Sequence, residues 1–506
     1  MAFFESLLAL LAVAIVLLQV SRRLKIPYPT MLAGAGVLLA LIPGAPQIGL
    51  DPHMALCLFI APIIVDAAYD FPIVAVRRYW RPLFALVVVA VLLSAASVAW
   101  LGVTFAGLPL FAALALGAIV APPDAAAATA VLSSVSMPRR SVTVLKGESL
   151  LNDASALLLF STAIALQGGH GVPHLGWHLA LAAPGGIALG IVLALLFRNV
   201  TPLLTRTRGG NLLEFVTSFG IWILADTLRL SPVLTVVAFA MTIARTANMT
   251  TAPRMRIHSF AVWDAVTFAL NVFAFLLLGF QARAIVSGMT PQRFHEAMVF
   301  AALVVITLIG VRLAWLLIYN RLSAHFKWVR GDVEPTTLRQ AMLIGWSGMR
   351  GLVTLATAYS LPADFPQRDL IVLTAFAVVL ATLVIQGLTL APLVKLLKLD
   401  GDNGLDAELD AVRAELAQTG LITLEGLHGK PAQVWRYNFE VDRDAGDALA
   451  DKRRLGLNAL RKQRERLEIL RAEERVGADA YLIVQEELDF TEVTLTCEEE
   501  RRIEEN

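Results

Sequence analysis

Long apolar segments follow one another through most of this chain, and they constrain its fold more than any other feature. About 20 consecutive apolar residues are needed for a helix to cross the core of a bilayer. Of the 506 residues, 57% are hydrophobic and only 16% are charged, whereas about a quarter is charged in a typical soluble domain. The sequence therefore predicts an all-α, polytopic membrane protein with thirteen apolar runs, at about 2–20, 27–46, 54–70, 82–106, 109–132, 141–167, 177–197, 211–228, 231–248, 261–281, 296–319, 336–361 and 369–397.

Lys and Arg residues are concentrated in every second loop between these runs. The other loops hold only Arg229, Arg283, Arg293 and Arg368. Because cytoplasmic loops carry the Lys and Arg excess, we expect thirteen spans with the N-terminus outside and the C-terminal tail in the cytoplasm. The basic loops hold Arg22, Arg23 and Lys25; Arg77, Arg78 and Arg81; Arg139, Arg140 and Lys146; Arg198, Arg206 and Arg208; Arg245, Arg254 and Arg256; and Arg321, Lys327, Arg330 and Arg339.

The charge balance divides the chain into two parts. Residues 1–400 hold 27 Lys and Arg against 16 Asp and Glu, and residues 401–506 hold 15 against 25. We expect a membrane domain over 1–398 and an acidic, helical cytoplasmic domain over 399–506. Within this tail we predict one long helix over Asp447–Leu488 and a shorter one over Gly404–Gly420. The tail is either a solvated appendage or a regulatory or dimerising element, and no basic cluster indicates nucleic-acid binding.

The fifth run contains two adjacent prolines followed by an acidic residue, Pro122, Pro123 and Asp124. An interior proline removes a backbone hydrogen bond and clashes with the preceding turn, but proline suits the first turn of a helix. We therefore expect the helix to break here and a half-helix to restart with Asp124 in its first turn, where the dipole favours a carboxylate. The alternative is a simple proline kink with a structural Asp.

The sixth run carries a cluster of polar side chains, Glu148, Ser149, Asn152 and Asp153. Ser149 and Asp153 are four residues apart and share a helix face, with Asn152 beside them. Ionisable groups within a bilayer are functional candidates by default, and these oxygens would form part of a shell for a monovalent cation. The alternative is that they only hold helices together. Glu148 lies five residues from Asp153 and needs another partner.

The twelfth run contains three glycines within seven residues, Gly345, Gly348 and Gly351. Glycine weakens a helix, so we expect a second unwound helix here. Arg350 keeps its proton and must be paired, and we predict a structural ion pair with Glu148. If runs 1–6 and 8–13 are repeats, runs 5 and 12 occupy corresponding positions, and paired broken helices of this kind mark a midplane site in secondary transporters.

Three motifs resemble those of the monovalent cation/proton antiporter-1 family, the sodium/proton exchangers of the NhaP and NHE type. They are Gly147–Asp153 (Gly-Glu-Ser-Leu-Leu-Asn-Asp), Gly345–Gly351 (Gly-Trp-Ser-Gly-Met-Arg-Gly) and Asn271–Gly279. The resemblance covers about residues 1–398. It implies thirteen helices with inverted repeats, crossed unwound helices in runs 5 and 12, and a homodimer. It also implies a cation and proton site made of Asp153, Asp124, Ser149 and Asn152, beside the Glu148–Arg350 pair.

The chain departs from the family pattern at two places. Pro123-Asp124-Ala125 stands where the family usually has Thr-Asp-Pro, so a threonine ligand is lost. Asp66 stands where the family usually has Glu, which shortens its reach by one methylene. Asp66 is either a third carboxylate of the site or a solvated residue near a helix end.

The predicted function is secondary transport in a cell membrane, of the bacterial inner-membrane kind. A monovalent cation, Na⁺ or else K⁺, would be exchanged for H⁺ in an electroneutral cycle, with both ions competing for Asp153 and the cation held at Asp124 and Asp153. We expect no cofactor and no enzymatic activity. The alternative is a cation channel or a cation/proton symporter that uses the same carboxylates. An intramembrane aspartyl protease is disfavoured because the chain has no Gly-x-Gly-Asp motif.

Overall fold

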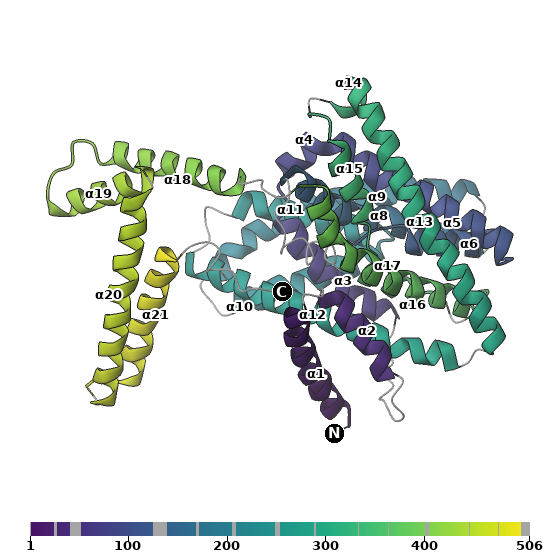
Figure 1. Cartoon of the computed structure of the whole chain (residues 1–506), viewed down its shortest axis with the longest axis horizontal. Coiled ribbons are helices and arrows are strands. Elements are labelled where there is room, and N and C mark those ends of the chain that lie inside the picture. The colour runs from purple at the N-terminus through teal and green to yellow at the C-terminus, as the bar shows by residue number, and fades with distance from the viewer. Residues whose placement is uncertain are drawn as a thin grey trace. The chain divides into compact units, whose positions relative to one another are not determined.

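The computed structural model contains helices and no strands in the residues that it describes, and it divides into two compact units (Figure 1). The first unit spans Met1–Gly401 and the second Asp402–Glu505. The described residues are 2–24, 28–40, 52–124, 139–167, 172–204, 209–247, 253–287, 290–331, 333–362, 364–399, 404–444, 446–473 and 475–496.

The first half of the membrane unit follows the predicted apolar runs. One departure lies in the fourth run, where the helix begins earlier and includes the basic residues that we assigned to a loop. A π-helical segment continues this helix, and Trp315 donates a hydrogen bond to the Ala85 carbonyl there at 2.9 Å. The elements are α1 (Ala2–Leu24), α2 (Tyr28–Ala40), α3 (Pro52–Tyr69), α4 (Ile73–Phe84), η1 (Ala85–Ala90), α5 (Val91–Phe105), α6 (Leu110–Val120) and α8 (Arg139–Gln167).

The second half contains the longest helices and a helix that is interrupted near its middle. Its elements are α9 (Val172–Leu204), α10 (Gly209–Thr227), α11 (Pro232–Ala247), α12 (Pro253–Ser287), α13 (Pro291–His325), α14 (Lys327–Arg330), α15 (Leu338–Trp346), α16 (Leu352–Tyr359) and α17 (Arg368–Leu396). Among the described residues, six helical segments are long and apolar enough to cross a membrane: 73–105, 141–167, 181–199, 256–275, 291–325 and 368–396. The count of thirteen spans and the outward N-terminus stay predictions.

Small residues let the helices of this unit approach closely. Gly117 of α6 packs against the main chain of α5, where a Cβ atom would overlap the Ala95 carbonyl oxygen. Gly190 of α9 packs in the same way against the Thr235 carbonyl of α11. Close backbone approach through small residues is a usual source of helix association in membranes, where lipid is as apolar as the side chains. These contacts fix the frame in which α6, α8 and α16 meet.

The second unit consists of two helical hairpins, and one prediction for it is wrong. The predicted single helix over Asp447–Leu488 is divided into α20 (Asp447–Ala472) and α21 (Ala478–Leu495). Folding back buries apolar side chains that a lone helix would expose, among them Leu460 and Leu467. The other hairpin is α18 (Gly404–Thr423), which covers the predicted shorter helix, and α19 (Lys430–Asp444).

Candidate functional site

The twelfth run is interrupted where its glycines are concentrated. Helix α15 ends at Trp346 and α16 begins at Leu352, and the residues between them are buried without being helical. Within this break, Ser347 donates to the Leu343 carbonyl at 2.8 Å, and the Arg350 amide donates to the Thr382 hydroxyl of α17 at 3.1 Å. The Arg350 amide, which the break frees, therefore finds a protein partner, as irregular backbone in a bilayer requires.

The fifth run is interrupted beside the first break. Helix α6 ends at Val120, and Pro122 and Pro123 lie in the non-helical residues that follow. The Asp124 amide donates to the Met349 carbonyl at 2.7 Å, so the two breaks are joined by a main-chain hydrogen bond. The predicted half-helix after Asp124 lies outside the described residues.

The Asp124 carboxylate lies at the N-terminus of α16. Its Oδ2 accepts from the Leu352 amide at 3.3 Å. The positive end of a helix dipole stabilises a carboxylate in this position. Gly351 makes the approach possible, because a Cβ atom there would overlap Asp124 Oδ2. Asp124 therefore lies at a helix N-terminus, as the sequence predicted. In the described residues this N-terminus belongs to α16, which follows the break in the twelfth run.

Helix α8 carries the other polar residues of the site. Asn152 is fully buried, and its Nδ2 donates to the Pro123 carbonyl at 2.7 Å. Its Oδ1 is buried without a hydrogen-bond partner in the described parts of the chain. Buried polar atoms are normally satisfied, so the amide oxygen is available to a ligand. Ser149, one turn earlier, is half-buried.

Asp153 is the carboxylate that the protein leaves uncompensated. Its side chain is 8% exposed and makes no hydrogen bond or ion pair with any described residue. The neighbouring charge on Asp124 acts on it as a like charge. A buried carboxylate is costly unless it is neutralised, so Asp153 needs a proton or a cation.

The predicted pairing of Glu148 with Arg350 is wrong. Glu148 accepts a bidentate pair of hydrogen bonds from Arg312 of α13, at 2.5 and 2.9 Å, and Arg312 also donates to the Ile344 carbonyl at 3.2 Å. A charged side chain near the end of a membrane helix can extend to the surface, but Arg312 is only 3% exposed. Gly348 makes room for it, since a Cβ atom there would lie 2.5 Å from Arg312 Cδ and Nε.

Arg350 instead contacts main-chain carbonyls in the two breaks. It donates to the Val120 carbonyl at 3.1 Å and to the Gly348 carbonyl. The carbonyl dipoles that helix interruption releases thus surround this buried cation. Its remaining nitrogen, Nη2, is buried without a partner in the described part of the chain.

Two further sequence predictions, for Gly345 and Asp66, and one other carboxylate, Glu214, can be placed in the structure. Gly345 was assigned to helix unwinding, but it lies inside α15 and packs against Leu313, so this assignment is wrong. Asp66 is half-buried on α3, a helix that packs against α8 and α16. Glu214 accepts from Ser259 and Trp263 at 2.6 and 2.8 Å, which ties α10 to α12.

Sequence reasoning missed Thr382 and the burial of Arg312. Thr382 lies in the long apolar run of α17, and a threonine there is unremarkable until the Arg350 amide is found to donate to its hydroxyl. A charged residue in an apolar run was the only signal for Arg312. Neither sequence position indicates which helix it contacts.

Two interrupted helices around buried carboxylates form the architecture of a secondary transporter. Residues 8–396 match the family model described as the transmembrane sodium/hydrogen exchanger, and the chain belongs to that family. This confirms the resemblance seen in the sequence motifs. The family is one of cation/proton antiporters and not of enzymes.

Similar proteins agree with this assignment. The chain is 29% identical over 476 residues to the sodium, potassium, lithium and rubidium/H⁺ antiporter of Bacillus pumilus, covering 89% of this chain and 68% of that protein. It is 29% identical over 428 residues to the Na⁺/H⁺ antiporter NhaS2 of Synechocystis, covering 84% and 75%. The fold resembles the sodium proton antiporter MjNhaP1 from Methanocaldococcus jannaschii, with a TM-score of 0.60, 17% identity, and coverage of 78% and 100%.

Proposed function

We propose that this protein exchanges a monovalent cation for H⁺ across a cell membrane, with the two ions competing for Asp153. The observation that carries the proposal is the uncompensated carboxylate of Asp153 where two interrupted helices meet. Proton and cation are alternative ways to neutralise one buried charge. Mutual exclusion at one site, combined with access from alternate sides, produces counterflow.

The remaining ligands of the cation would be oxygens from both breaks. The Asn152 side chain is held by the bond from Nδ2 to the Pro123 carbonyl, and Oδ1 has no hydrogen-bond partner in the described residues, so it could coordinate a cation. The Asp124 carboxylate reaches the same region from the other chain segment, and Ser149 and Asp66 are the next candidates. Hard monovalent cations suit carboxylate, amide and hydroxyl oxygens.

We propose Na⁺ as the first substrate and K⁺ as the second. Both ions occur in the name of the antiporter from Bacillus pumilus, and Na⁺ in that of NhaS2. The neighbouring Asn152 and Asp153 fit an electroneutral exchange of one cation for one proton, as the family resemblance implies. The working unit would be a homodimer in the cell membrane, with the tail in the cytoplasm.

Uptake of labelled Na⁺ into proteoliposomes with an acidic interior tests the proposal. We expect uptake by the wild type, together with proton efflux, and uptake at the level of empty vesicles for Asp153→Asn. The control is Asp226→Asn, at an exposed position near the end of α10, which should leave exchange unchanged. Normal exchange by Asp153→Asn would show that the site is elsewhere, and movement of both ions in one direction would indicate a symporter.

A further inference from the structure

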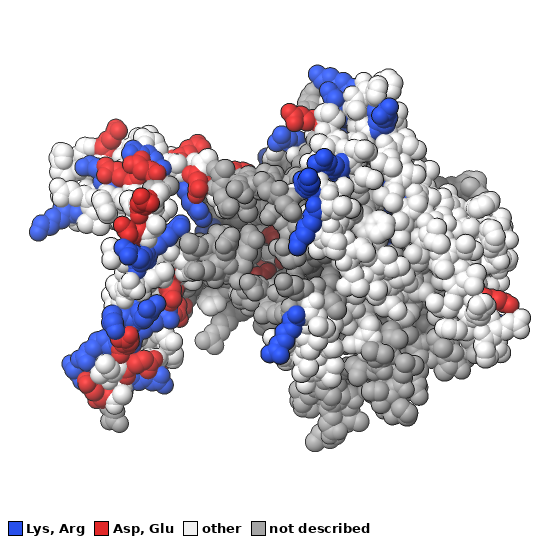
Figure 2. All heavy atoms as spheres, in the orientation of Figure 1, with Lys and Arg blue, Asp and Glu red and all other residues white. Residues whose placement is uncertain are grey.

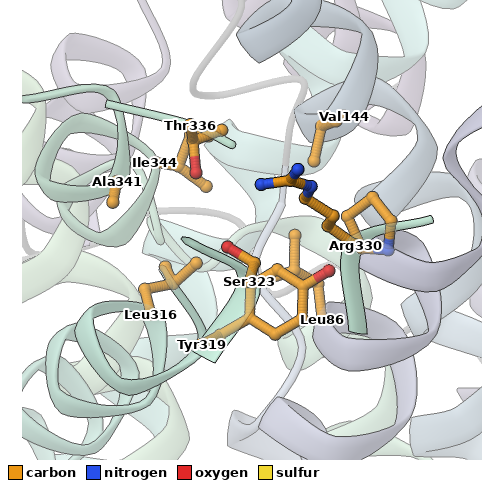
Figure 3. Close-up of a pocket in the computed structure, with 10 residues that line it drawn as sticks. Leu86, Val144, Leu316, Tyr319, Ser323, Arg330, Thr336, Ala341 and Ile344 are labelled. Carbon is orange, nitrogen blue, oxygen red and sulfur yellow. The ribbon is translucent and has the colours of Figure 1, made fainter. Parts of the chain in front are cut away.

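A small, largely apolar cavity with a few polar side chains in its wall lies between α4 and η1 on one side and α13 and α15 on the other (Figure 3). It measures about 30 Å³ and its wall includes Arg330, Tyr319, Ser323 and Thr336 above an apolar floor with Leu86 and Leu316. Figure 3 shows the Arg330 guanidinium pointing into the space between these side chains. None of these residues belongs to the Asp153 site.

Arg330 is a half-buried cation in the wall of this cavity. It makes no hydrogen bond or ion pair with the residues that the structure describes. By contrast, Ser323 and Thr336 are both anchored to Asn320, at 2.9 Å each. A guanidinium presents five donors in a fork that matches the oxygens of a phosphate. The cavity thus has a fixed polar wall and one free cation.

A second uncompensated cation stands beside this cavity. Arg81 of α4 donates to the Trp328 carbonyl at 2.7 Å, and it lies next to Gly331. Its guanidinium also covers the Trp80 ring, 5.2 Å from the centroid. Figure 2 shows several Lys and Arg side chains at this end of the membrane unit, around α14, with an acidic side chain beside them. Arg81 is thus held by carbonyls and an aromatic ring and has no carboxylate partner among the described residues, so its charge can add to the attraction for an anion.

The surroundings are those of a membrane surface. Trp328 is 84% exposed, and Trp80, Phe84 and Phe326 are exposed beside it. Exposed aromatic rings next to Lys and Arg are typical of the boundary between lipid and water. The loops that carry Arg81 and Arg330 were both predicted to face the cytoplasm, where anionic lipids attract basic residues.

We propose that this cavity binds the phosphate group of an anionic phospholipid, with Arg330 as its main ligand. The apolar floor and the exposed aromatic rings favour a lipid over a free anion, because a dissolved phosphate would gain nothing from them. The cavity wall also touches the ion-exchange core. Ile344 lines the cavity, and its carbonyl accepts from Arg312, so a bound lipid would stabilise the contact between α13 and α15.

Lipid retention by the full-length protein tests the proposal independently of ion exchange. The measurement is native mass spectrometry of the purified protein titrated with phosphatidylglycerol or with phosphatidylcholine. We expect the wild type to hold phosphatidylglycerol more tightly, and Arg330→Gln to weaken it by about fivefold, the value of one basic residue near an anionic lipid surface. The control is Arg339→Gln, an exposed arginine of α15 that does not line the cavity.

Three further arms make the result decisive. Arg330→Lys keeps the charge but loses the fork, and it should bind with intermediate affinity; it also replaces Arg330→Gln if that variant does not fold. Thermal unfolding should show stabilisation of the wild type by phosphatidylglycerol and little by inorganic phosphate. Equal loss in Arg330→Gln and Arg339→Gln, or equal retention of both lipids by the wild type, overturns the proposal. If inorganic phosphate stabilises the wild type as much as phosphatidylglycerol does, the cavity binds free anions and the lipid proposal is wrong.

Discussion

Arginine–carboxylate pairs occur in both units of the chain, but in opposite surroundings. Glu148 and Arg312 pair inside the membrane unit with 1% and 3% of their side chains exposed. Arg464 of the tail pairs with Asp489 at 2.5 Å and with Glu492, and all three side chains are at least 40% exposed. Water can replace either partner in the tail, whereas nothing replaces a missing partner in the core. The same chemical pair therefore has different consequences in the two units.

The membrane unit also contains single charges that are not paired with an opposite charge. Arg350 is surrounded by carbonyls of the two breaks, and Asp153 has no described protein partner. These two solutions differ in one respect. The carbonyls around Arg350 are fixed, while the neutralising partner of Asp153 must come from outside. This difference distinguishes a structural charge from the proposed transport site.

The largest expected effect is at Asp153. We expect Asp153→Ala to abolish cation-dependent proton movement in vesicles. The matched substitution in the tail, Asp489→Ala, removes an exposed paired carboxylate and should keep nearly the full rate. Equal exchange rates for the two variants would show that the buried carboxylate of the membrane unit matters no more for exchange than the exposed carboxylate of the tail.

The next effect concerns the corrected ion pair. Arg312→Met should destabilise the folded protein by about 3–5 kcal/mol, because Glu148 is left buried and unpaired. In thermal unfolding, the double variant Arg312→Met with Glu148→Gln should recover part of this loss. The cycle of Glu148→Gln with Arg350→Met is the comparison, and a stronger coupling there than with Arg312 would contradict the observed pairing.

Gly351 offers a smaller test of the contact between the two breaks. Gly351→Ala should destabilise the protein by about 1–3 kcal/mol through overpacking against Asp124, and it should slow exchange because Asp124 must move. Gly310→Ala in α13 is the control, since a Cβ atom there meets nothing within 4 Å. Unchanged exchange and stability in Gly351→Ala would mean that the approach of Asp124 to α16 is not required.

The smallest effect is expected in the tail. Arg464→Met should change stability by about 0–1 kcal/mol, as is usual for exposed pairs. Thermal unfolding at low and high salt measures this, because added salt screens exposed pairs and should reduce even that difference. A loss as large as that of Arg312→Met would show that exposure does not set the value of these pairs.

The sequence predicted the features that depend on local chemistry. Adjacent Pro122 and Pro123 interrupt a helix wherever they lie in its interior, because they remove hydrogen bonds. The spacing of Ser149, Asn152 and Asp153 places them together on any helix, since it follows from 3.6 residues per turn. The apolar runs, the positions of the two breaks and the family could all be predicted from such local patterns in the sequence.

Partner choice, by contrast, was decided only by tertiary structure. Glu148 and Arg312 are 164 residues apart, and their pairing depends on α8 packing beside α13. The sequence argument selected Arg350 instead, because charge and depth were all that the sequence offered. The position of Asp124 at the start of α16 and the free guanidinium of Arg330 likewise arise from packing between distant segments. Local backbone geometry depends on residues that are close in sequence and can be predicted from them. The neighbours of a buried charge depend on which distant helices pack together.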